Sequence, residues 1–245
     1  MRILALDSSG LVAGVAVLES ENEKKDAQTI AEYTVNYKKT HSQTLLPMLD
    51  EIVKMTELDL ESVDAIAVAA GPGSFTGLRI GSATAKGLGL ALKKPLVAVP
   101  TVDALAYNLY DAQGLVCPVM DARRKQVYTG IYKFENHQLV TVKEQWAAPM
   151  EELIEELNER GETVIFLGDG VPVFREMIQE KLKVPYSFAP AHLNKQRAAA
   201  VAALGMIHYK EGRTETAEEH TPEYLRLSQA ERERAEREKA QKTEK

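Results

Sequence analysis

The stretch that decides the fold is VAAGPGSFTGLRIGSATAKGLGLA (68–91). An apolar strand end leads into a Gly-Pro-Gly turn, and a glycine-rich helix follows the turn. Glycine costs a helix interior about 1 kcal/mol relative to alanine, so its repeated use needs a physical reason. Either the loop binds a phosphate, or another backbone packs closely against the helix. The glycines of the helix are Gly77, Gly81, Gly87 and Gly89.

The loop AAGPGSFTG (69–77) lies between a strand and a helix, where free amide groups and the helix dipole can hold an anion. It is not a Walker loop, because no Lys-Ser or Lys-Thr pair follows its last glycine, and it does not match GxGxxG. We favour the simpler interpretation. Gly71 and Gly73 then make a tight turn, and Ser74 caps the helix.

Small residues recur every four positions along the helix and therefore form one stripe on its surface. A stripe without bulky side chains lets another backbone approach closely. That backbone belongs either to the protein's own sheet or to a helix of another chain, and the residues alone leave both alternatives open. The stripe consists of Gly77, Gly81, Ala85 and Gly89.

Hydrophobic patterns on both sides of the loop predict an α/β half with a mixed sheet. Three short apolar runs come first and predict an antiparallel meander. Helices connect the later strands, as parallel pairing requires. The predicted strands are 2–7, 12–20, 29–37, 63–70 and 95–100, and the predicted helices are 41–57 and 75–92.

The second part of the chain repeats the first strand pair. Both ILALDSSGLVAGVAVLE (3–19) and LVCPVMDARRKQVYTGIYKFE (115–135) give a strand, a turn that begins with aspartate, and a strand that contains glycine. A strand, a Gly-Asp-Gly turn and a helix are predicted over 163–182, and a further helix over 193–212. The repeat is weak, because many hairpins share this pattern.

Composition excludes several classes of protein. The 245 residues carry a net charge of −6, which argues against a general attraction to nucleic acid, because a phosphate backbone favours a basic surface. Cys117 is the only cysteine, so an intramolecular disulfide and a Cys-based zinc site are excluded. The start, MRILALDSSG, enters a strand pattern without a secretory leader, and no apolar run approaches the ~20 residues that span a bilayer. We therefore expect a cytoplasmic protein without membrane contact.

Two aspartates that end strands are candidates for nucleotide binding. In nucleotide-binding sheets of the actin and sugar-kinase type, a strand-Asp-turn of this kind contacts metal-bound phosphate. Such turns usually have glycine two residues after the aspartate, where this sequence has Ser9. A capped β-turn is the simpler alternative. The candidates are Asp7, Ser8, Ser9, Asp121, Gly168, Asp169 and Gly170.

The remaining patterns give little indication of a binding or catalytic site. Arg123, Arg124 and Lys125 form a tight basic cluster, which a solvated hairpin turn explains more simply than RNA contact. The five histidines have no HxxxH or HExxH spacing, and no serine lies within GxSxG. The residues alone therefore predict neither a complete catalytic site nor a metal site.

Five segments, in this order, resemble the TsaB (YeaZ) family over about residues 1–228. They are ILALDSSGLVAGVAV, HSQTLLPML, VAAGPGSFTGLRIGSATAKGLGLAL, VMDARRKQVYTG and PEYLR (222–226). GPGSFTGLRIG is the most specific of these. The resemblance implies an α/β fold of the actin/Hsp70/sugar-kinase (ASKHA) type with two related halves. We place the halves at 1–105 and 106–228, followed by a charged tail at 229–245.

The TsaB family is similar to TsaD, the catalytic subunit of bacterial tRNA threonylcarbamoyladenosine synthesis. TsaD proteins carry a segment like PVHHMEGH, whose two histidines four residues apart bind the catalytic metal. The corresponding stretch here is AVPTVDAL (98–105), which places Thr101 and Leu105 at the ligand positions. Leucine cannot coordinate a metal, and one hydroxyl does not replace imidazole. The resemblance therefore implies a chain without catalytic residues or a metal.

The resemblance also implies partners. A TsaB-type chain binds and stabilises TsaD, a P-loop ATPase called TsaE joins the complex, and tRNA is reached only through that complex. Homodimers are expected when TsaD is absent. No cofactor is certain, and ATP or ADP with magnesium at the complex interface is the alternative. The implied contact uses the helices 41–57 and 75–92, with His41, Leu45, Leu49, Ile52, Gly77, Gly81, Ala85 and Gly89 at the interface.

Overall fold

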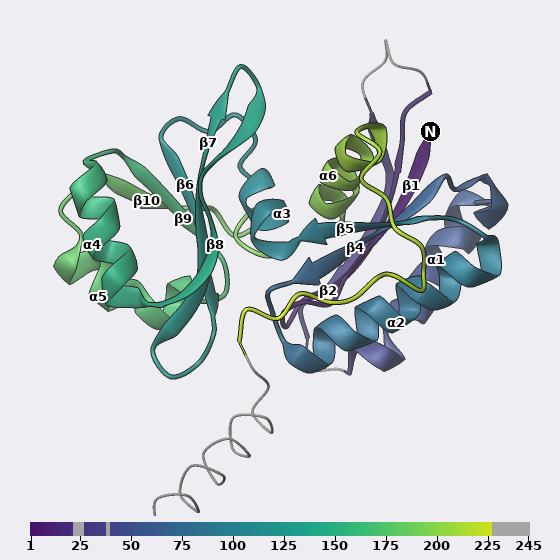
Figure 1. The fold of residues 1–245 in the computed structure, drawn as a ribbon, viewed down its shortest axis with the longest axis horizontal. Helices are drawn as coiled ribbons and strands as arrows, with labels where there is room; N and C mark the ends of the chain where they lie inside the picture. Colours follow the sequence, from purple (N-terminus) through teal and green to yellow (C-terminus); the bar gives the residue numbers. More distant parts are fainter. Residues whose placement is uncertain (22–26, 38–39, 227–245) are drawn as a thin grey trace, which may run out of the picture.

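Two five-stranded mixed sheets with the same internal order make up the fold (Figure 1). The computed structural model describes residues 1–21, 27–37 and 40–226, so the predicted tail at 229–245 lies outside the described residues. The first sheet has the order β3-β2-β1-β4-β5 and the second the order β10-β9-β6-β7-β8. Read from the opposite edge, the second order repeats the first. The predicted α/β fold of the ASKHA type is confirmed.

The first sheet contains the predicted meander. β1 pairs antiparallel with β2 and β2 with β3, whereas β1–β4 and β4–β5 are parallel. The helix predicted over 75–92 has these bounds in the structure. The elements are β1 (Arg2–Asp7), β2 (Ala13–Glu19), β3 (Gln28–Val35), η1 (His41–Gln43), α1 (Leu45–Thr56), η2 (Leu60–Ser62), β4 (Ala65–Gly71), α2 (Phe75–Leu92) and β5 (Leu96–Pro100).

The second sheet confirms the predicted repeat and extends it beyond the hairpin. β6, β7 and β8 form an antiparallel meander, and β6–β9 and β9–β10 are parallel. Sequence patterns missed β8, α4 and β10. The elements are β6 (Leu115–Asp121), β7 (Gln126–Glu135), β8 (Gln138–Pro149), α4 (Met150–Arg160), β9 (Val164–Leu167), α5 (Val171–Lys181) and β10 (Tyr186–Phe188).

Each half covers part of its core with a helix from the other half. α3 (Thr101–Tyr107) follows the first sheet, but its Val102 and Leu105 pack in the core of the second. α6 (Ala198–Lys210) follows the second sheet and packs on the first, on the side opposite α1 and α2 (Figure 1). The predicted boundary of the second half at 106–228 is therefore wrong from residue 198 onward. The cause is that α6 is apolar on almost all sides and needs the first sheet to bury it.

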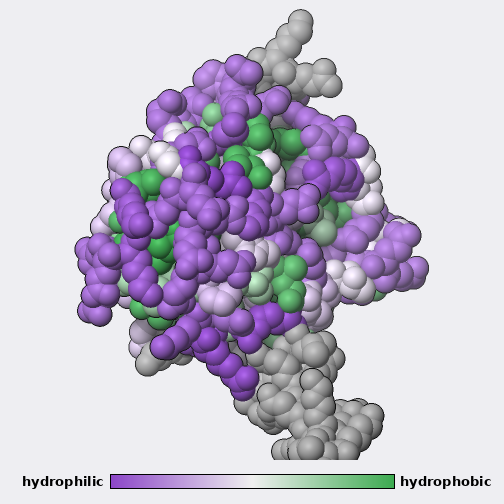
Figure 2. All heavy atoms as spheres, turned by 60° about the vertical axis from the view of Figure 1, so that its left-hand side comes forward, coloured by the Kyte–Doolittle hydropathy of each residue, from purple (hydrophilic) through white to green (hydrophobic). Residues whose placement is uncertain are grey.

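The cores lie between the sheets and their helices. Figure 2 shows a mainly hydrophilic face, on which hydrophobic residues appear only in separate patches. α1 directs its apolar stripe at the first sheet, where Leu45, Leu49 and Ile52 are at most 4% exposed. The expectation that these three side chains contact a partner is wrong, because they are already buried.

In the described parts of the chain, no helix has the length and apolarity that crossing a membrane requires.

The glycine stripe of α2 also faces the chain's own sheet. A Cβ atom on Gly77 would lie 2.0 Å from the Ser8 carbonyl oxygen, and one on Gly81 would lie 2.6 Å from the Ser8 Oγ. A Cβ atom on Gly89 would lie 3.0 Å from a methyl group of Leu96. The expectation that these glycines admit a foreign helix is wrong, because strands and turns of the same half occupy that space.

Two further small residues of α2, Ala85 and Gly87, differ from each other. Ala85 belongs to the stripe and is completely buried in the first core, so it cannot contact a partner either. A Cβ atom on Gly87 would meet nothing within 4 Å. Packing within the chain therefore explains the whole stripe but not Gly87.

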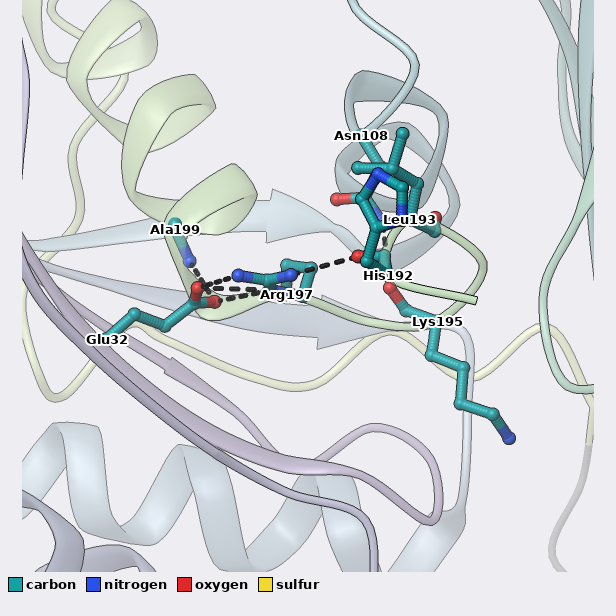
Figure 3. Close-up of polar contacts among 7 residues, drawn as sticks. All are labelled: Glu32, Asn108, His192, Leu193, Lys195, Arg197 and Ala199. Atoms are coloured by element: carbon teal, nitrogen blue, oxygen red, sulfur yellow. Dashed lines mark hydrogen bonds and ion pairs between the residues drawn. The ribbon is translucent and has the colours of Figure 1, made fainter. Parts of the chain in front are cut away.

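A polar cluster fixes the chain where it returns to the first half (Figure 3). The Arg197 Nε donates to both carboxylate oxygens of Glu32, at 3.0 and 3.1 Å, and its Nη2 also contacts that carboxylate. The Ala199 amide donates to the same group at 3.2 Å. Burial would raise the pKa of Glu32, but the hydrogen bonds from Arg197 and Ala199 outweigh it and hold the pKa below its usual value.

The same returning segment is held from the second half. The Asn108 side chain, just after α3, donates to the carbonyl oxygens of Leu193 at 3.1 Å and Lys195 at 2.7 Å (Figure 3). The Arg197 Nη1 donates to the carbonyl oxygen of His192 at 2.9 Å. The path from β10 to α6 is thus fixed to both halves within a few residues.

We predict opposite effects for the same substitution at two positions of α2. Gly77→Ala should destabilise the protein by about 1–3 kcal/mol, because its Cβ collides with a backbone oxygen that cannot move freely. Gly87→Ala should stabilise it by about 0.5–1 kcal/mol, because alanine favours the helix and meets open space. Urea unfolding measures both. Equal effects at the two positions would contradict this packing of α2.

Glu32→Gln should lower the free energy of unfolding by about 1 kcal/mol at neutral pH, a modest amount because Arg197 is partly exposed and solvent screens the pair. The pKa of Glu32 is lower in the folded state, so its contribution is present above the unfolded-state pKa of about 4.3 and is lost as the pH falls through the folded-state value. The wild-type and Glu32→Gln stability curves should therefore converge in acid. A constant difference down to acidic pH would exclude this pairing.

Candidate functional site

A cleft of about 590 Å³ opens between the two halves. Each half contributes the turn after its first strand, at 9–11 and 120–123. The N-terminus of α2 and its loop contribute 73–76, and the last described residues contribute 223–226. The cleft therefore collects segments from four distant parts of the sequence.

The first turn is fixed from within. The Asp7 Oδ1 accepts hydrogen bonds from the Ser9 amide at 2.9 Å and the Ser9 hydroxyl at 2.6 Å, and Asp7 is only 2% exposed. Burial raises the pKa of the Asp7 carboxyl, although the Ser9 bonds act in the opposite direction. The Ser8 hydroxyl donates to the carbonyl oxygen of Gly77 at 2.9 Å. Asp7 and Ser8 therefore lie beneath the cleft, and only Ser9 lines it.

The glycine loop packs against this turn. A Cβ atom on Gly73 would lie 2.3 Å from the carbonyl oxygen of Ser9, and the Ser74 amide donates to that oxygen at 2.6 Å. The Ser74 Oγ accepts from the Gly77 amide at 3.3 Å and caps α2. The predicted tight turn with a serine cap is confirmed. Close contact between two loops explains Gly73 without a phosphate.

The second turn brings two carboxyl groups together. The Asp121 amide donates to the Asp169 Oδ1 at 3.3 Å. Arg123 binds the Asp121 carboxylate through its backbone amide at 2.8 Å and its guanidinium at 2.9 Å. Burial, together with the nearby charge of Asp121, raises the pKa of Asp169. Asp121 and Asp169 both line the cleft, and Arg123 forms an ion pair with the first of them.

The glycines beside Asp169 have a packing role. A Cβ atom would lie 2.2 Å from the carbonyl oxygen of Val119 at Gly168 and 2.9 Å from it at Gly170. The Gly170 amide donates to this oxygen at 2.9 Å. Of the predicted nucleotide-binding residues, the cleft thus exposes Ser9, Asp121 and Asp169, while both glycines are buried behind them.

One residue predicted at a partner interface lines the cleft, and sequence patterns missed a segment of the cleft. His41, predicted at a partner interface, lines the cleft, and its Nε2 lies 2.8 Å from the carbonyl oxygen of Gly10. Residues 222–226, the sequence PEYLR, carried the family resemblance but no predicted role. Glu223 and Arg226 line the cleft, and so do the residues between them. A Pro-aromatic-Arg run beside a charged tail was the available signal.

Among the residues that the structure describes, none forms a strongly basic wall of the cleft. It contains the carboxyl groups of Asp121, Asp169 and Glu223, together with the guanidinium groups of Arg123 and Arg226. Arg123 is paired with Asp121, and the Arg226 Nη1 donates to a backbone oxygen at 2.6 Å. A polyphosphate would therefore meet repulsion from the carboxylates unless a cation accompanied it.

The positions that correspond to the metal ligands of TsaD lie elsewhere, in α3. Thr101 is completely buried and Leu105 is 1% exposed, both inside the protein. Asp103, between them, accepts a hydrogen bond from the Tyr132 hydroxyl at 2.7 Å. Within the described ranges, no three His, Cys, Asp or Glu side chains are grouped to hold a metal. These residues do not fit the TsaD metal.

Comparisons with known proteins identify the family. The family model "TsaD: tRNA N6-adenosine threonylcarbamoyltransferase" matches residues 28–234. The tRNA threonylcarbamoyladenosine biosynthesis protein TsaB of Bacillus subtilis is 36% identical, over 94% of this chain and 96% of the relative. The Escherichia coli protein of the same name is 29% identical, over 92% and 95%. The solved structure of YeaZ from Pseudomonas aeruginosa matches with a TM-score of 0.73 and 26% identity, over 91% of this chain and 99% of that one. The chain therefore belongs to the family that the threonylcarbamoyltransferase model describes, and within it to the TsaB (YeaZ) proteins.

Proposed function

We propose that this chain is a non-catalytic subunit in tRNA threonylcarbamoyladenosine synthesis. It binds a TsaD-type catalytic subunit and stabilises its active conformation, while that subunit transfers the threonylcarbamoyl group to the adenosine next to the anticodon. The relatives named as biosynthesis proteins TsaB support a role in this pathway. The coverage of 96% of the Bacillus subtilis relative supports assignment of the role to the whole chain.

The observation that carries the non-catalytic part is the burial of α3. The side chains of Thr101 and Leu105 stand where TsaD proteins have metal-binding histidines, and both are enclosed by the protein. Leu105 packs in the second core together with Val102. A metal at this position would need both a different ligand set and an open space. Neither is available at these residues.

The outer faces of α1 and α2 support the partner contact. The two helices cover the same side of the first sheet, so their remaining faces point outward together (Figure 1). These faces carry large apolar side chains: Leu46 is 54% exposed and Met55 76% exposed on α1, and Leu90 is 62% exposed on α2. Exposed apolar residues on neighbouring elements are typical of protein interfaces.

Gly87 adds a specific argument for α2. Its missing side chain costs helix stability, and among the described residues no atom lies close enough to require the absence of a Cβ atom. A foreign backbone that approaches α2 at this point supplies the reason. The predicted helices thus remain the proposed contact, but the contacting residues change from the buried stripe to Leu46, Met55, Gly87 and Leu90.

The remaining partners are part of the same proposal. A TsaE-type P-loop ATPase joins the complex, and tRNA is bound through the complex rather than by this chain alone. The net charge of −6 is consistent with that division, since it gives no general attraction to phosphate. Without TsaD, a second copy of the chain covers the same outer faces of α1 and α2. We place the complex in the cytoplasm.

Leu90→Asp tests the proposed contact. A carboxylate at the centre of an apolar interface should weaken binding to the TsaD-type subunit at least tenfold, about 1.4 kcal/mol, because the charge loses water without gaining a partner. Titration calorimetry with the purified partner measures the affinity. Leu90→Asp should also lower the rate of reconstituted tRNA modification, in parallel with the loss of affinity. The same assay is run with the wild-type chain and without any chain as references.

Val173→Asp is the matched control. Val173 is an exposed apolar residue on α5 of the second half, 60% accessible, so the same substitution there should leave binding unchanged. Normal binding by Leu90→Asp would exclude the outer face of α2 as the contact. Full tRNA modification in the absence of the chain would exclude the proposed function itself.

The alternative function is an ATP-using enzyme of the kinase-like fold. It is favoured by one observation, the convergence of Ser9, Asp121 and Asp169 on the cleft. Bound magnesium would offset the repulsion between these carboxylates and a polyphosphate. The glycine turns do not support this alternative, because their close contacts are with the chain's own carbonyl oxygens.

Titration of the isolated chain with Mg-ATP separates the two functions. We expect no ATP turnover above that of a denatured sample, because the carboxylates of the cleft are paired or buried. Asp121→Asn should support tRNA modification as well as the wild type does. Turnover that Asp121→Asn abolishes would establish the enzyme instead.

A further inference from the structure

The last described residues, 222–226, form a strap that begins on the first half. The Glu223 amide donates to the carbonyl oxygen of Ala70 at 2.7 Å, and so extends the end of β4. Gly71 lies directly beneath it, because a Cβ atom there would be 2.2 Å from the Glu223 carbonyl oxygen. Gly71 also has a φ of +128°, which L side chains rarely adopt. The loop before α2 is therefore shaped to hold the strap.

The next strap residue is held by the first turn of α2. The ring of Tyr224 packs on that of Phe75, with centroids 4.7 Å apart. The Arg79 guanidinium lies 4.0 Å above the Phe75 ring, and its Nε is 3.4 Å from the Tyr224 hydroxyl. Phe75 and Arg79 thus hold the aromatic residue of the strap, although Tyr224 keeps 39% of its surface accessible.

The strap then reaches the second half. The Gln145 side chain on β8 donates to the Glu223 carboxylate at 2.8 Å. The Arg226 Nη1 donates to the carbonyl oxygen of Ala122, in the turn after β6, at 2.6 Å. The strap therefore has an extensive base on the first half and a smaller set of polar contacts on the second.

The strap lies at a different place from the other two connections between the halves. The chain crosses between the sheets at α3 and at the segment before α6, and α3 packs against α6. The strap passes below α3 in Figure 1, and its residues 223–226 line the cleft. A rotation of the halves about the α3–α6 contact would separate the walls of the cleft, and the strap joins those walls.

We propose that the strap is a latch that holds the cleft closed. Its base on β4 and α2 stays in place, while the contacts at Gln145 and Ala122 set how far the second half can turn away. Polar contacts at a partly exposed surface can be exchanged for water, so this end is the one that releases. When it releases, the turn after β6 moves away from the turn after β1, and the cleft opens.

A pair of spin labels across the cleft tests the latch. Cys117 is the only cysteine and is completely buried, so Leu11→Cys and Arg124→Cys introduce the only accessible thiols. These positions are exposed on the two turns that face each other across the cleft. Pulsed electron paramagnetic resonance should give a longer mean distance and a wider distribution for a chain ending at residue 221 than for one ending at residue 226. The chain ending at 226 is the control, because both lack residues 227–245.

A second variant keeps the test decisive if the shorter chain does not fold. Arg226→Gln combined with Gln145→Ala removes the side-chain contacts of the strap at Ala122 and Gln145 while the strap itself stays in the chain. It should shift the label distance in the same direction by a smaller amount. Arg175→Gln, an exposed arginine on α5 away from the strap, should leave the distance unchanged. An unaltered distribution in the double variant would overturn the latch.

Discussion

The fold depends on a close contact between carbonyl oxygens and residues that lack a side chain. In the first half, the oxygens of Ser8 and Ser9 press against Gly77 and Gly73, so the turn after β1 is seated on the N-terminus of α2. In the second half, the oxygen of Val119 presses against the glycines at 168 and 170 in the turn before α5. A side chain at these glycines would push the end of β1 away from α2, which follows β4, and the end of β6 away from α5, which follows β9. The same device thus occurs once in each repeat, and the cleft lies between the two.

This constraint changes the interpretation of the glycine-rich loop. A glycine loop before a helix suggests a phosphate site, but here the space that a phosphate would need at Gly73 is taken by the protein itself. The aspartates likewise bind groups of the protein itself. Asp7 accepts hydrogen bonds within its own turn, and Asp121 pairs with Arg123. The chain therefore uses these polar groups to hold its own turns together. This favours a subunit that acts through its surface.

The two halves are linked by exchange rather than by a shared sheet. α3 leaves the first half to complete the second core, and α6 returns to complete the first, so neither half buries its apolar surface alone. The Glu32–Arg197 pair and the Asn108 side chain fix the returning segment on one side of the molecule. Residues 222–226 join the halves on the other side, along the cleft. If the latch releases as proposed, the halves turn relative to each other at the cleft, where the strap's contacts with the second half are polar.

The sequence by itself determined the elements whose signals are local. Alternating and 3.6-residue periodicity located the meander and the bounds of α2, Ser74 was identified as its cap, and the two aspartate turns gave a weak indication of the repeat. It did not locate α4, β8 or β10, nor the strap's role. Only the tertiary structure decided what covers each face. Periodicity places Gly77 and Gly81 on a small-residue face of α2 and Leu45 on an apolar face of α1. A sheet of the same chain and a helix of another chain can cover such faces equally well. The return of α6 to the first sheet was hidden for the same reason, because the burial of an apolar helix is a contact between residues far apart in the chain.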